Sequence, residues 1–417
     1  MKTKALFIAL LVSSTAFAQN QSSMSSNPLL QPFSTPHQTA PYDKIKPEHF
    51  LPALKEAMAE GRKEIAAITG NTAKPTFENT ILALEQGGGN VGKISAVLFH
   101  LNGAETNPEI QKTVREASPM LTEYGNDITL NDKLFARVKA VWDQRDKLKL
   151  DTESAMLLEK TYKSFSRNGA NLNDVDKEKM RGINKELSQL SIKFAENNLA
   201  ETNEYTLEIT DEKDLAGLPD FVKEGAKATA KKMNKEGWVF TLQAPSYGPF
   251  MQYSDNRELR KKLFLAYNAR GFSGGKNDNQ ANIAQIVKLR YEKAKLLGYE
   301  TWADYMLEER MANSKQIVAN FLSDVKKYAE PAAAKELAEL TNYAKKNGFT
   351  EDKLQRWDVS YYSERLKKEK YAINDELLKP YFKLENVLDG IFTLTNKLYG
   401  ITFKENKDIA GWNPEVK

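Results

Sequence analysis

The sequence contains no cysteine. This absence excludes a disulfide framework, thiolate metal sites, cysteine nucleophiles and a lipidated cysteine behind a signal peptide. Histidine is nearly as scarce, with 3 residues, His37, His49 and His100. No two of them have the i, i+4 spacing that turns two imidazoles toward one zinc ion on a helical face. We therefore expect surface or packing roles for all three, and the residues alone give no metal ligand and no catalytic residue.

Long apolar runs are missing after the first residues of the chain. Residues 5–17 form an apolar run that follows a short basic start and ends in a small-x-small pattern at Ala18. The run is shorter than the roughly 20 residues that cross a bilayer. This pattern is typical of a secretory signal peptide, residues 1–18, cleaved between Ala18 and Gln19. We expect an exported, periplasmic protein with no membrane segment after cleavage.

Charge of one sign is not in excess either. The 60 Lys and Arg stand against 56 Asp and Glu, and the net charge of +4 falls to +2 when Lys2 and Lys4 leave with the signal peptide. Because positive and negative charges nearly balance, the sequence does not indicate a basic surface for nucleic acid. With 28% charged and 41% hydrophobic residues the composition is that of a globular protein. We expect no nucleic-acid partner.

Helical periodicity fills most of the remaining chain. Residues 19–38, rich in Ser, Asn and Pro, predict a flexible leader. After it, apolar residues recur at helical spacing almost without interruption, most clearly from about residue 174 to 199. The last helix is expected to end at Gly400, where glycine suits a left-handed C-terminal cap. Its seam predicts packing against a neighbour, and consists of Leu384, Val387, Ile391, Leu394 and Leu398.

Two segments alternate with the period of a β-strand. Residues 205–209 and 238–242 are expected to pair as a small ribbon, and residues 401–403 begin another strand-like run. The predicted fold class is therefore mostly α, a large multi-helix assembly with a small β ribbon.

The run Gly271-Phe272-Ser273-Gly274-Gly275 matches the pattern of a hydrolase nucleophile elbow. Such a serine needs a preceding strand and a later histidine to accept its proton. A helical pattern precedes this run, and no histidine follows Ser273. We interpret the run as a flexible loop.

Paired aromatic residues stand among charges in residues 357–390. Trp357, Tyr361 and Tyr362 are the most informative, because a phenol can line a peptide groove and donate a hydrogen bond. The alternative is packing in the core, where a buried aromatic contributes mainly area. The residues themselves leave both interpretations open.

Several stretches, in the same order, resemble the thimet oligopeptidase family of zinc metallopeptidases, and within it the bacterial peptidyl-dipeptidases, also called dipeptidyl carboxypeptidases. The likeness extends from about residue 27 to residue 417. The stretches that carry it are residues 27–45, 77–85, 268–279, 286–299, 311–312 and 357–382.

The resemblance implies a clam-like, nearly all-helical fold in which two halves flank a channel for short peptides. Residues 39–270 would form the lid half, and residues 271–417 the start of an incomplete catalytic half. It also implies one zinc ion, held by the two histidines of an HExxH helix and a further glutamate. The glutamate inside HExxH would act as general base, and the product would be a C-terminal dipeptide. We expect a monomer.

The HExxH motif is absent from these 417 residues. In the family it lies downstream of the stretch that Trp412 begins, so no zinc ligand, general base or other catalytic residue is carried over. Only Trp357, Tyr361 and Tyr362 are assigned to the channel wall. We expect the N-terminal portion of an exported zinc peptidase, unable by itself to hold zinc or to cleave. The alternative is a non-catalytic helical protein that binds peptides.

Overall fold

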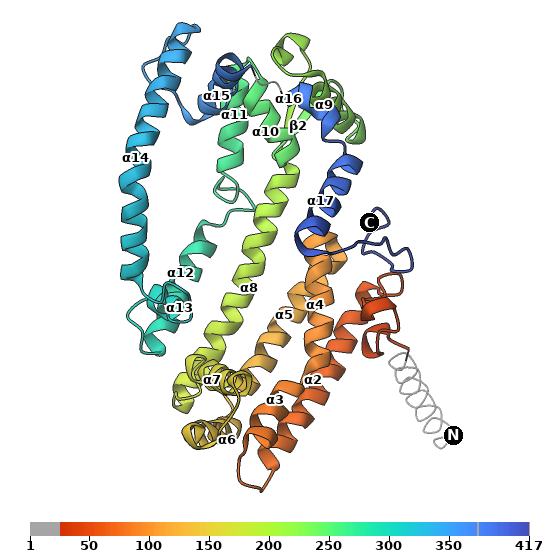
Figure 1. Cartoon of the computed structure of the whole chain (residues 1–417), viewed down its shortest axis with the longest axis vertical. Helices are drawn as coiled ribbons and strands as arrows, with labels where there is room; N and C mark the ends of the chain where they lie inside the picture. Colours follow the sequence, from red (N-terminus) through yellow and green to blue (C-terminus); the bar gives the residue numbers. More distant parts are fainter. Residues whose placement is uncertain (1–25, 373–374, 417) are drawn as a thin grey trace, which may run out of the picture. The chain divides into compact units, whose positions relative to one another are not determined.

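The computed structural model describes residues 26–372 and 375–416 (Figure 1). The predicted signal peptide, with its cleavage site between Ala18 and Gln19, lies outside these residues, as does the first part of the predicted leader. The longer helices are α2 (Pro47–Gly70), α4 (Gly89–Ala104), α5 (Pro108–Thr129), α6 (Asp132–Trp142), α7 (Thr152–Arg167), α8 (Asp174–Glu204), α9 (Asp220–Lys232), α10 (Ala244–Tyr253), α11 (Arg257–Asn268), α12 (Gln280–Leu296), α14 (Lys315–Lys346), α15 (Arg356–Tyr371) and α17 (Leu384–Tyr399).

Shorter elements connect these helices. They are η1 (Pro28–Leu30), η2 (Pro36–Gln38), η3 (Phe77–Leu82), α3 (Ala83–Gln86), η4 (Arg145–Lys147), β1 (Thr206–Ile209), η5 (Glu212–Leu215), β2 (Trp238–Thr241), α13 (Trp302–Leu307), α16 (Asp375–Leu378) and η6 (Lys379–Tyr381). The predicted class, mostly α with a small ribbon, is confirmed. None of the helices that the structure describes has an apolar stretch of the length that a bilayer crossing requires.

The two strands pair in antiparallel fashion, with Thr206 opposite Thr241 and Ile209 opposite Trp238, as predicted. The strand-like run at 401–403 is a wrong prediction, because these residues have no regular structure. So short a run is stable as a strand only with a partner, and here the ring of Phe403 stacks on Phe392 of α17 with centroids 4.4 Å apart.

The chain divides into two compact units. The first contains the described residues up to Gln189, together with Glu292–Gly298 and the described residues from Lys404. The second contains Leu190–Tyr291 and Tyr299–Phe403. Helix α8 contributes to both units. The predicted division at residue 270 concerns a functional lid and catalytic half, and it stays a prediction.

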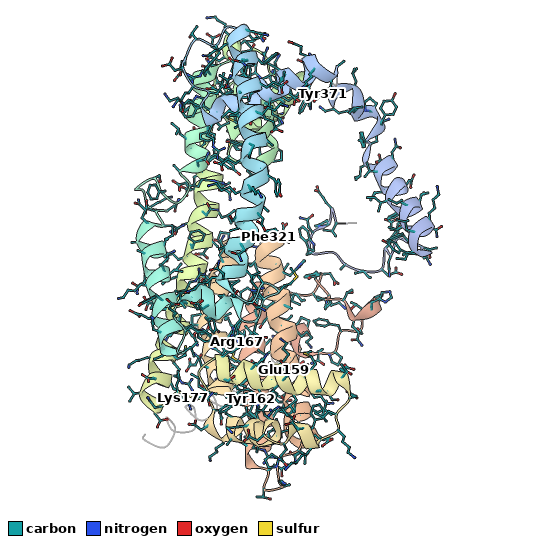
Figure 2. The ribbon with its side chains drawn as sticks, turned by 60° about the vertical axis from the view of Figure 1, so that its left-hand side comes forward. Glu159, Tyr162, Arg167, Lys177, Phe321 and Tyr371 are labelled. Atoms are coloured by element: carbon teal, nitrogen blue, oxygen red, sulfur yellow. The ribbon has the colours of Figure 1, made fainter. Side chains whose placement is uncertain are left out.

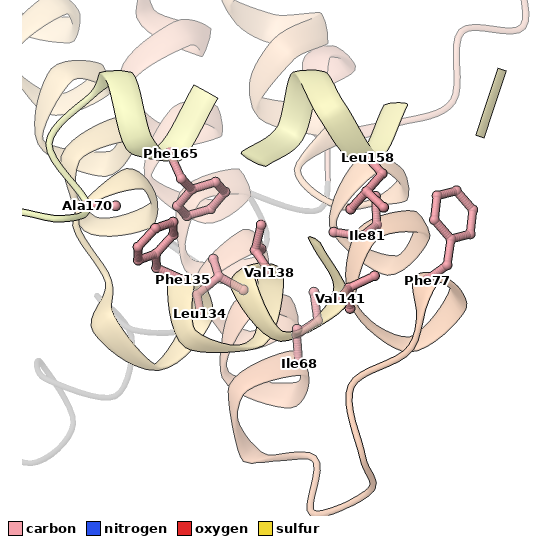
Figure 3. Close-up of a cluster of buried hydrophobic side chains, with 10 residues drawn as sticks. All are labelled: Ile68, Phe77, Ile81, Leu134, Phe135, Val138, Val141, Leu158, Phe165 and Ala170. Atoms are coloured by element: carbon pink, nitrogen blue, oxygen red, sulfur yellow. The ribbon is translucent and has the colours of Figure 1, made fainter. Parts of the chain in front are cut away.

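In the first unit, α2 packs against α4, α5 and α6. One apolar cluster brings α6 and α7 together with the end of α2 (Figure 3), and consists of Ile68, Phe77, Ile81, Leu134, Phe135, Val138, Val141, Leu158, Phe165 and Ala170. The predicted leader is not flexible throughout. Leu29 is fully buried, and the side-chain amide of Asn27 donates to the carbonyl of His49 (2.8 Å). The buried Leu29 thus anchors this segment on α2.

In the second unit, the ribbon packs against α9 and α10. Its apolar core consists of Leu207, Ile209, Leu215, Leu218, Val222, Ala226, Phe240, Leu242, Phe250 and Leu263. A smaller cluster of Leu340, Ala344, Phe349 and Tyr362 joins the end of α14 to α15. Helix α15 also packs on α10 and α11.

Helix α17 ends as predicted but does not pack as predicted. Gly400 caps it in the left-handed conformation (φ +68°). Its seam is exposed, with Leu384 at 65%, Ile391 at 49% and Leu398 at 62%. Periodicity shows that a helix has an apolar face, but it does not show what covers that face.

Candidate functional site

Helix α15 carries all three residues that the sequence assigned to a channel wall. The helix begins after Gln355, whose backbone N–H donates to Oδ2 of Asp358 (3.0 Å). Trp357, Tyr361 and Tyr362 follow within its first two turns. Asp358 stands among them and is fully buried. Sequence reasoning did not select it, although an acid at the third position of a helix is a recognisable capping signal.

Asp358 binds two arginines of α11. Arg257 donates to it twice, from Nε to Oδ1 and from Nη2 to Oδ2, both at 2.9 Å. Arg260 donates from Nη2 to Oδ1 (3.2 Å) and is itself 1% exposed. A charge removed from water is tolerated only when it is paired and fully hydrogen bonded. The three side chains therefore fix α15 on α11.

The remaining donors of Arg260 are also used. Its Nη1 donates to the carbonyl of Ser254 (2.7 Å), and its Nε donates to the carbonyl of Trp357 (3.1 Å). Burial lowers the pKa of Arg260 from its ordinary value, and the hydrogen bond with Asp358 opposes that shift. A guanidinium keeps its proton under such conditions, so the site retains a buried cation.

Tyr361 forms the solvent-facing edge of the cluster. The guanidinium carbons of Arg260 and Arg365 lie 4.0 and 4.3 Å from the centre of its ring. Its hydroxyl donates to Oδ1 of Asp255 (2.9 Å), which also pairs with Arg365. Burial first, and then this hydrogen bond, raise the pKa of Tyr361 to about 12. At neutral pH the residue is therefore a phenol, able to donate and to stack on cations.

The other two predicted residues differ in role. Tyr362 is 8% exposed and meets the ring of Phe349 edge to face, 5.7 Å between centroids, which is the core packing that the sequence left open as an alternative. Trp357 is half-buried and packs edge to face on Phe264 at 5.9 Å. The structure thus brings all three residues to one cluster, and their assignment to a substrate channel stays a prediction.

The charged side chains of this cluster hold one another and the helices in place. Both carboxylates in it, Asp255 and Asp358, are engaged by cations, so neither is a free general base. The exposed part presents Arg365 and the partly exposed Arg257, which also pairs with Glu351.

The histidines do not assemble a metal site. Within residues 26–372 and 375–416 no group of three or more His, Cys, Asp or Glu side chains is placed to hold a metal ion. His37 lies in η2 and His100 in α4, while Nδ1 of His49 accepts from the backbone of Lys46 (3.1 Å) at the start of α2. The described residues therefore offer no set of side chains that fits the zinc ion that the family resemblance implies.

The serine of the elbow-like run sits in a loop, as predicted. Its Oγ donates to the carboxylate of Glu201 on α8, and the backbone N–H of Gly271 donates to the same carboxylate. Ser273 thereby anchors the loop on α8, and a helix, α11, precedes the loop in place of the strand that a nucleophile elbow needs.

A cavity lies elsewhere, in the first unit. It measures about 940 Å³ between α2 and α5, and its lining carries charges of both signs, among them Glu48, Lys55, Glu109 and Lys112. None of the predicted site residues lines it. Mixed charge without a buried unpaired group gives it no evident ligand.

Comparison with known proteins identifies the chain's relatives. Residues 250–417, which include the α15 cluster, match the sequence model described as peptidase family M3. The chain is 36% identical over 395 residues to oligopeptidase A of Escherichia coli, covering 94% of this chain and 57% of that protein. It is 36% identical over 398 residues to dipeptidyl carboxypeptidase of Salmonella typhimurium, covering 94% and 58%.

A more distant relative is saccharolysin of Saccharomyces cerevisiae, 29% identical over 355 residues, or 82% of this chain and 49% of that protein. The identity does not separate the oligopeptidase A relatives from the dipeptidyl carboxypeptidases, since both stand at 36%. The chain spans 57% and 58% of the length of the two bacterial relatives and 49% of that of saccharolysin. On these grounds residues 250–417 match the model of peptidase family M3, and nearly the whole chain is similar to oligopeptidase A and dipeptidyl carboxypeptidase.

Proposed function

We propose that the whole protein is a zinc-dependent metallopeptidase that hydrolyses short oligopeptides and releases C-terminal dipeptides. The observation that carries this proposal is the 36% identity, over 94% of the chain, to proteins named oligopeptidase A and dipeptidyl carboxypeptidase. The family resemblance supplies the zinc chemistry, in which the metal activates a water molecule for attack on the peptide carbonyl.

The second part of the proposal concerns the 417 residues themselves. They contain no HExxH motif, and their 3 histidines are dispersed. We infer that this chain neither holds zinc nor cleaves peptides, and that it contributes the N-terminal portion of the enzyme. Export to the periplasm through residues 1–18 belongs to the same proposal.

A direct assay tests the inactive state. Purified residues 19–417 are incubated with an N-blocked tripeptide, with and without added zinc, and bound zinc is measured in parallel. We expect no dipeptide release and no stoichiometric zinc, with oligopeptidase A of Escherichia coli as the active control. Hydrolysis that a chelator abolishes would contradict the inactivity of the chain.

The coding sequence beyond Lys417 tests the parent activity. A reading frame that continues into an HExxH helix supports the peptidase. An immediate stop codon would favour the alternative, a helical peptide-binding protein, and calorimetric binding of short peptides without metal would then identify it.

A further inference from the structure

Helix α14 presents an apolar stripe to solvent. Ile317, Phe321, Val325 and Tyr328 recur at spacings of four, four and three residues, which places them on one face. They are exposed to 49%, 65%, 47% and 73%. The helix contacts α13 near its start, at Lys315, and α15 near its end, at Leu340 and Ala344. Phe321 lies on the stretch between these contacts (Figure 2).

Helix α17 presents a second stripe. Leu384, Ile391, Leu394 and Leu398 are exposed to 65%, 49%, 56% and 62%. A helix of this length gains most of its stability from packing its apolar face, because isolated helices of such lengths are marginal in water. Contiguous exposed patches of this kind mark binding surfaces.

The charges beside the α17 stripe disfavour a membrane as the partner. Helices that lie on membranes carry Lys and Arg along their polar face. Here Glu385 and Asp389 occupy that part of α17, against Lys397. An anionic lipid surface would therefore be repelled as much as attracted.

The lengths of the relatives point to a protein partner. Both stripes lie in residues 250–417, the part matched by the family model, and yet the chain spans only 57% of oligopeptidase A. We propose that the stripes of α14 and α17 bind the further M3 polypeptide that these relatives contain, through helices that pack their own apolar ridges into both stripes. The inference rests on the family match and the exposed stripes, and it holds whether or not the assembled protein cleaves peptides.

The absence of cysteine allows a site-specific test. Single-cysteine variants Phe321→Cys and Ile391→Cys report on the stripes, and Ser323→Cys and Thr393→Cys report on the opposite faces of the same helices. Each variant is prepared alone and as a fusion with the part of Escherichia coli oligopeptidase A outside the aligned residues. The fusion keeps the local concentration of the partner high. The rate of alkylation by iodoacetamide is measured for each thiol.

We expect the stripe thiols to react about tenfold or more slowly in the fusion than alone, since buried thiols are inert, while the two controls keep their rates. Equal rates for all four thiols in the fusion would overturn the proposal. So would stripe thiols that are already protected in the chain alone and lose that protection on dilution, which would identify a second copy as the occupant. Protection by anionic phospholipid vesicles would identify a membrane.

Charge substitutions test the same surface without a label. Phe321→Lys and Ile391→Lys should weaken binding of the separate oligopeptidase A segment by roughly 30-fold or more, as for buried anchors of an interface. Ser323→Lys and Thr393→Lys should leave it unchanged. Peptide cleavage by the fusion is scored independently. If the stripe thiols are protected but the fusion cleaves no peptide, this inference holds and the proposed function fails. If the fusion cleaves peptides but the stripe thiols are not protected, the proposed function holds and this inference fails.

Discussion

Asp358 of α15 holds this helix on α11 through its ion pairs with Arg257 and Arg260. It is 0% exposed, and it neutralises Arg260, which is also buried. Removal of one partner from such a pair leaves an uncompensated charge away from water, which costs far more than an exposed ion pair contributes.

Asp358→Asn is expected to lower the free energy of unfolding by about 3 to 5 kcal/mol, because Arg260 then lacks its counter-charge. The matched control is Asp127→Asn, since Asp127 pairs with Arg62 (3.0 Å) and Arg181 (2.9 Å) at an exposed position. We expect about 1 kcal/mol or less for the control. Urea unfolding of both variants measures the difference, and equal losses would contradict the structural role of Asp358.

Lys293 is a partly buried cation on α12 that binds a side-chain amide. Its Nζ donates to Oδ1 of Asn184 (2.7 Å), whose amide in turn donates to Asn126 (2.8 Å). Burial lowers the pKa of Lys293 from 10.5 to about 8. Between these two values the unfolded chain binds more protons than the folded chain, so the stability of the fold rises as the pH increases through this window.

Lys293→Met should therefore stabilise the protein near neutral pH, by up to about 3 kcal/mol, and remove this part of the pH dependence. Denaturant unfolding at about pH 7 and about pH 10 measures both effects. Lys139→Met, at an exposed ion pair, serves as the control and should leave the pH dependence in place. A steeper rise with pH in Lys293→Met than in the parent protein would show that the sign is wrong.

At the scale of elements, the β ribbon depends on one glycine. Gly237 precedes β2 with φ +72°, and a Cβ there would collide with the carbonyl oxygen of Ile209 at the end of β1. Both the backbone conformation and the space thus require glycine. Gly225, on the exposed face of α9, has nothing within 4 Å of its would-be Cβ.

Gly237→Ala is expected to destabilise the second unit by at least about 2 kcal/mol, because it combines strain with a clash. Gly225→Ala should instead be neutral or stabilising by up to about 1 kcal/mol, since alanine is the better helix former. Thermal unfolding followed by circular dichroism distinguishes the two. If Gly237→Ala is as stable as the parent protein, the backbone before β2 can adopt a different conformation that accommodates a Cβ, and the expectation is wrong.

Sequence periodicity predicted the helices well, because helical spacing and caps are local. Helix α8 was expected from about residue 174 to 199 and extends to Glu204. Gly400 caps α17 as expected. The predictions that failed concern strand pairing and helix packing, which depend on residues far apart in the sequence. The run at 401–403 found no strand to pair with, and the α17 seam has no cover in the described part of the chain.

The same distinction explains the candidate site. Aromatic pairs among charges drew attention to Trp357, Tyr361 and Tyr362, which do lie in one cluster. Arg257 and Arg260 were not found, because they stand about a hundred residues before Asp358 and nothing in the sequence links them. Arginines and aspartates are common in a chain with 28% charged residues, so only the fold identifies this pairing.

At the scale of the whole molecule, export is the property to measure. A protein without cysteine needs no oxidant to reach its final state, so its stability is the same in reducing and oxidising compartments. Expression of the full chain in a Gram-negative host should yield a periplasmic protein whose mass corresponds to a start at Gln19. Leu10→Arg, which interrupts the apolar run, should leave an unprocessed cytoplasmic chain. A full-length mass in the periplasm would contradict cleavage at Ala18.

The ion pair between Arg260 of α11 and Asp358 of α15 also bears on the order in which the second unit folds. Arg260 and Asp358 are 98 residues apart, so a ribosome adding about 5 to 20 residues per second makes the arginine many seconds before its counter-charge. Until then α10 and α11 lack the helix that covers them. Contacts of such long sequence separation form late and slow the folding of a domain. We therefore expect α15 to dock late, and until it does, the surfaces of α10 and α11 that it covers stay exposed to aggregation and to proteases.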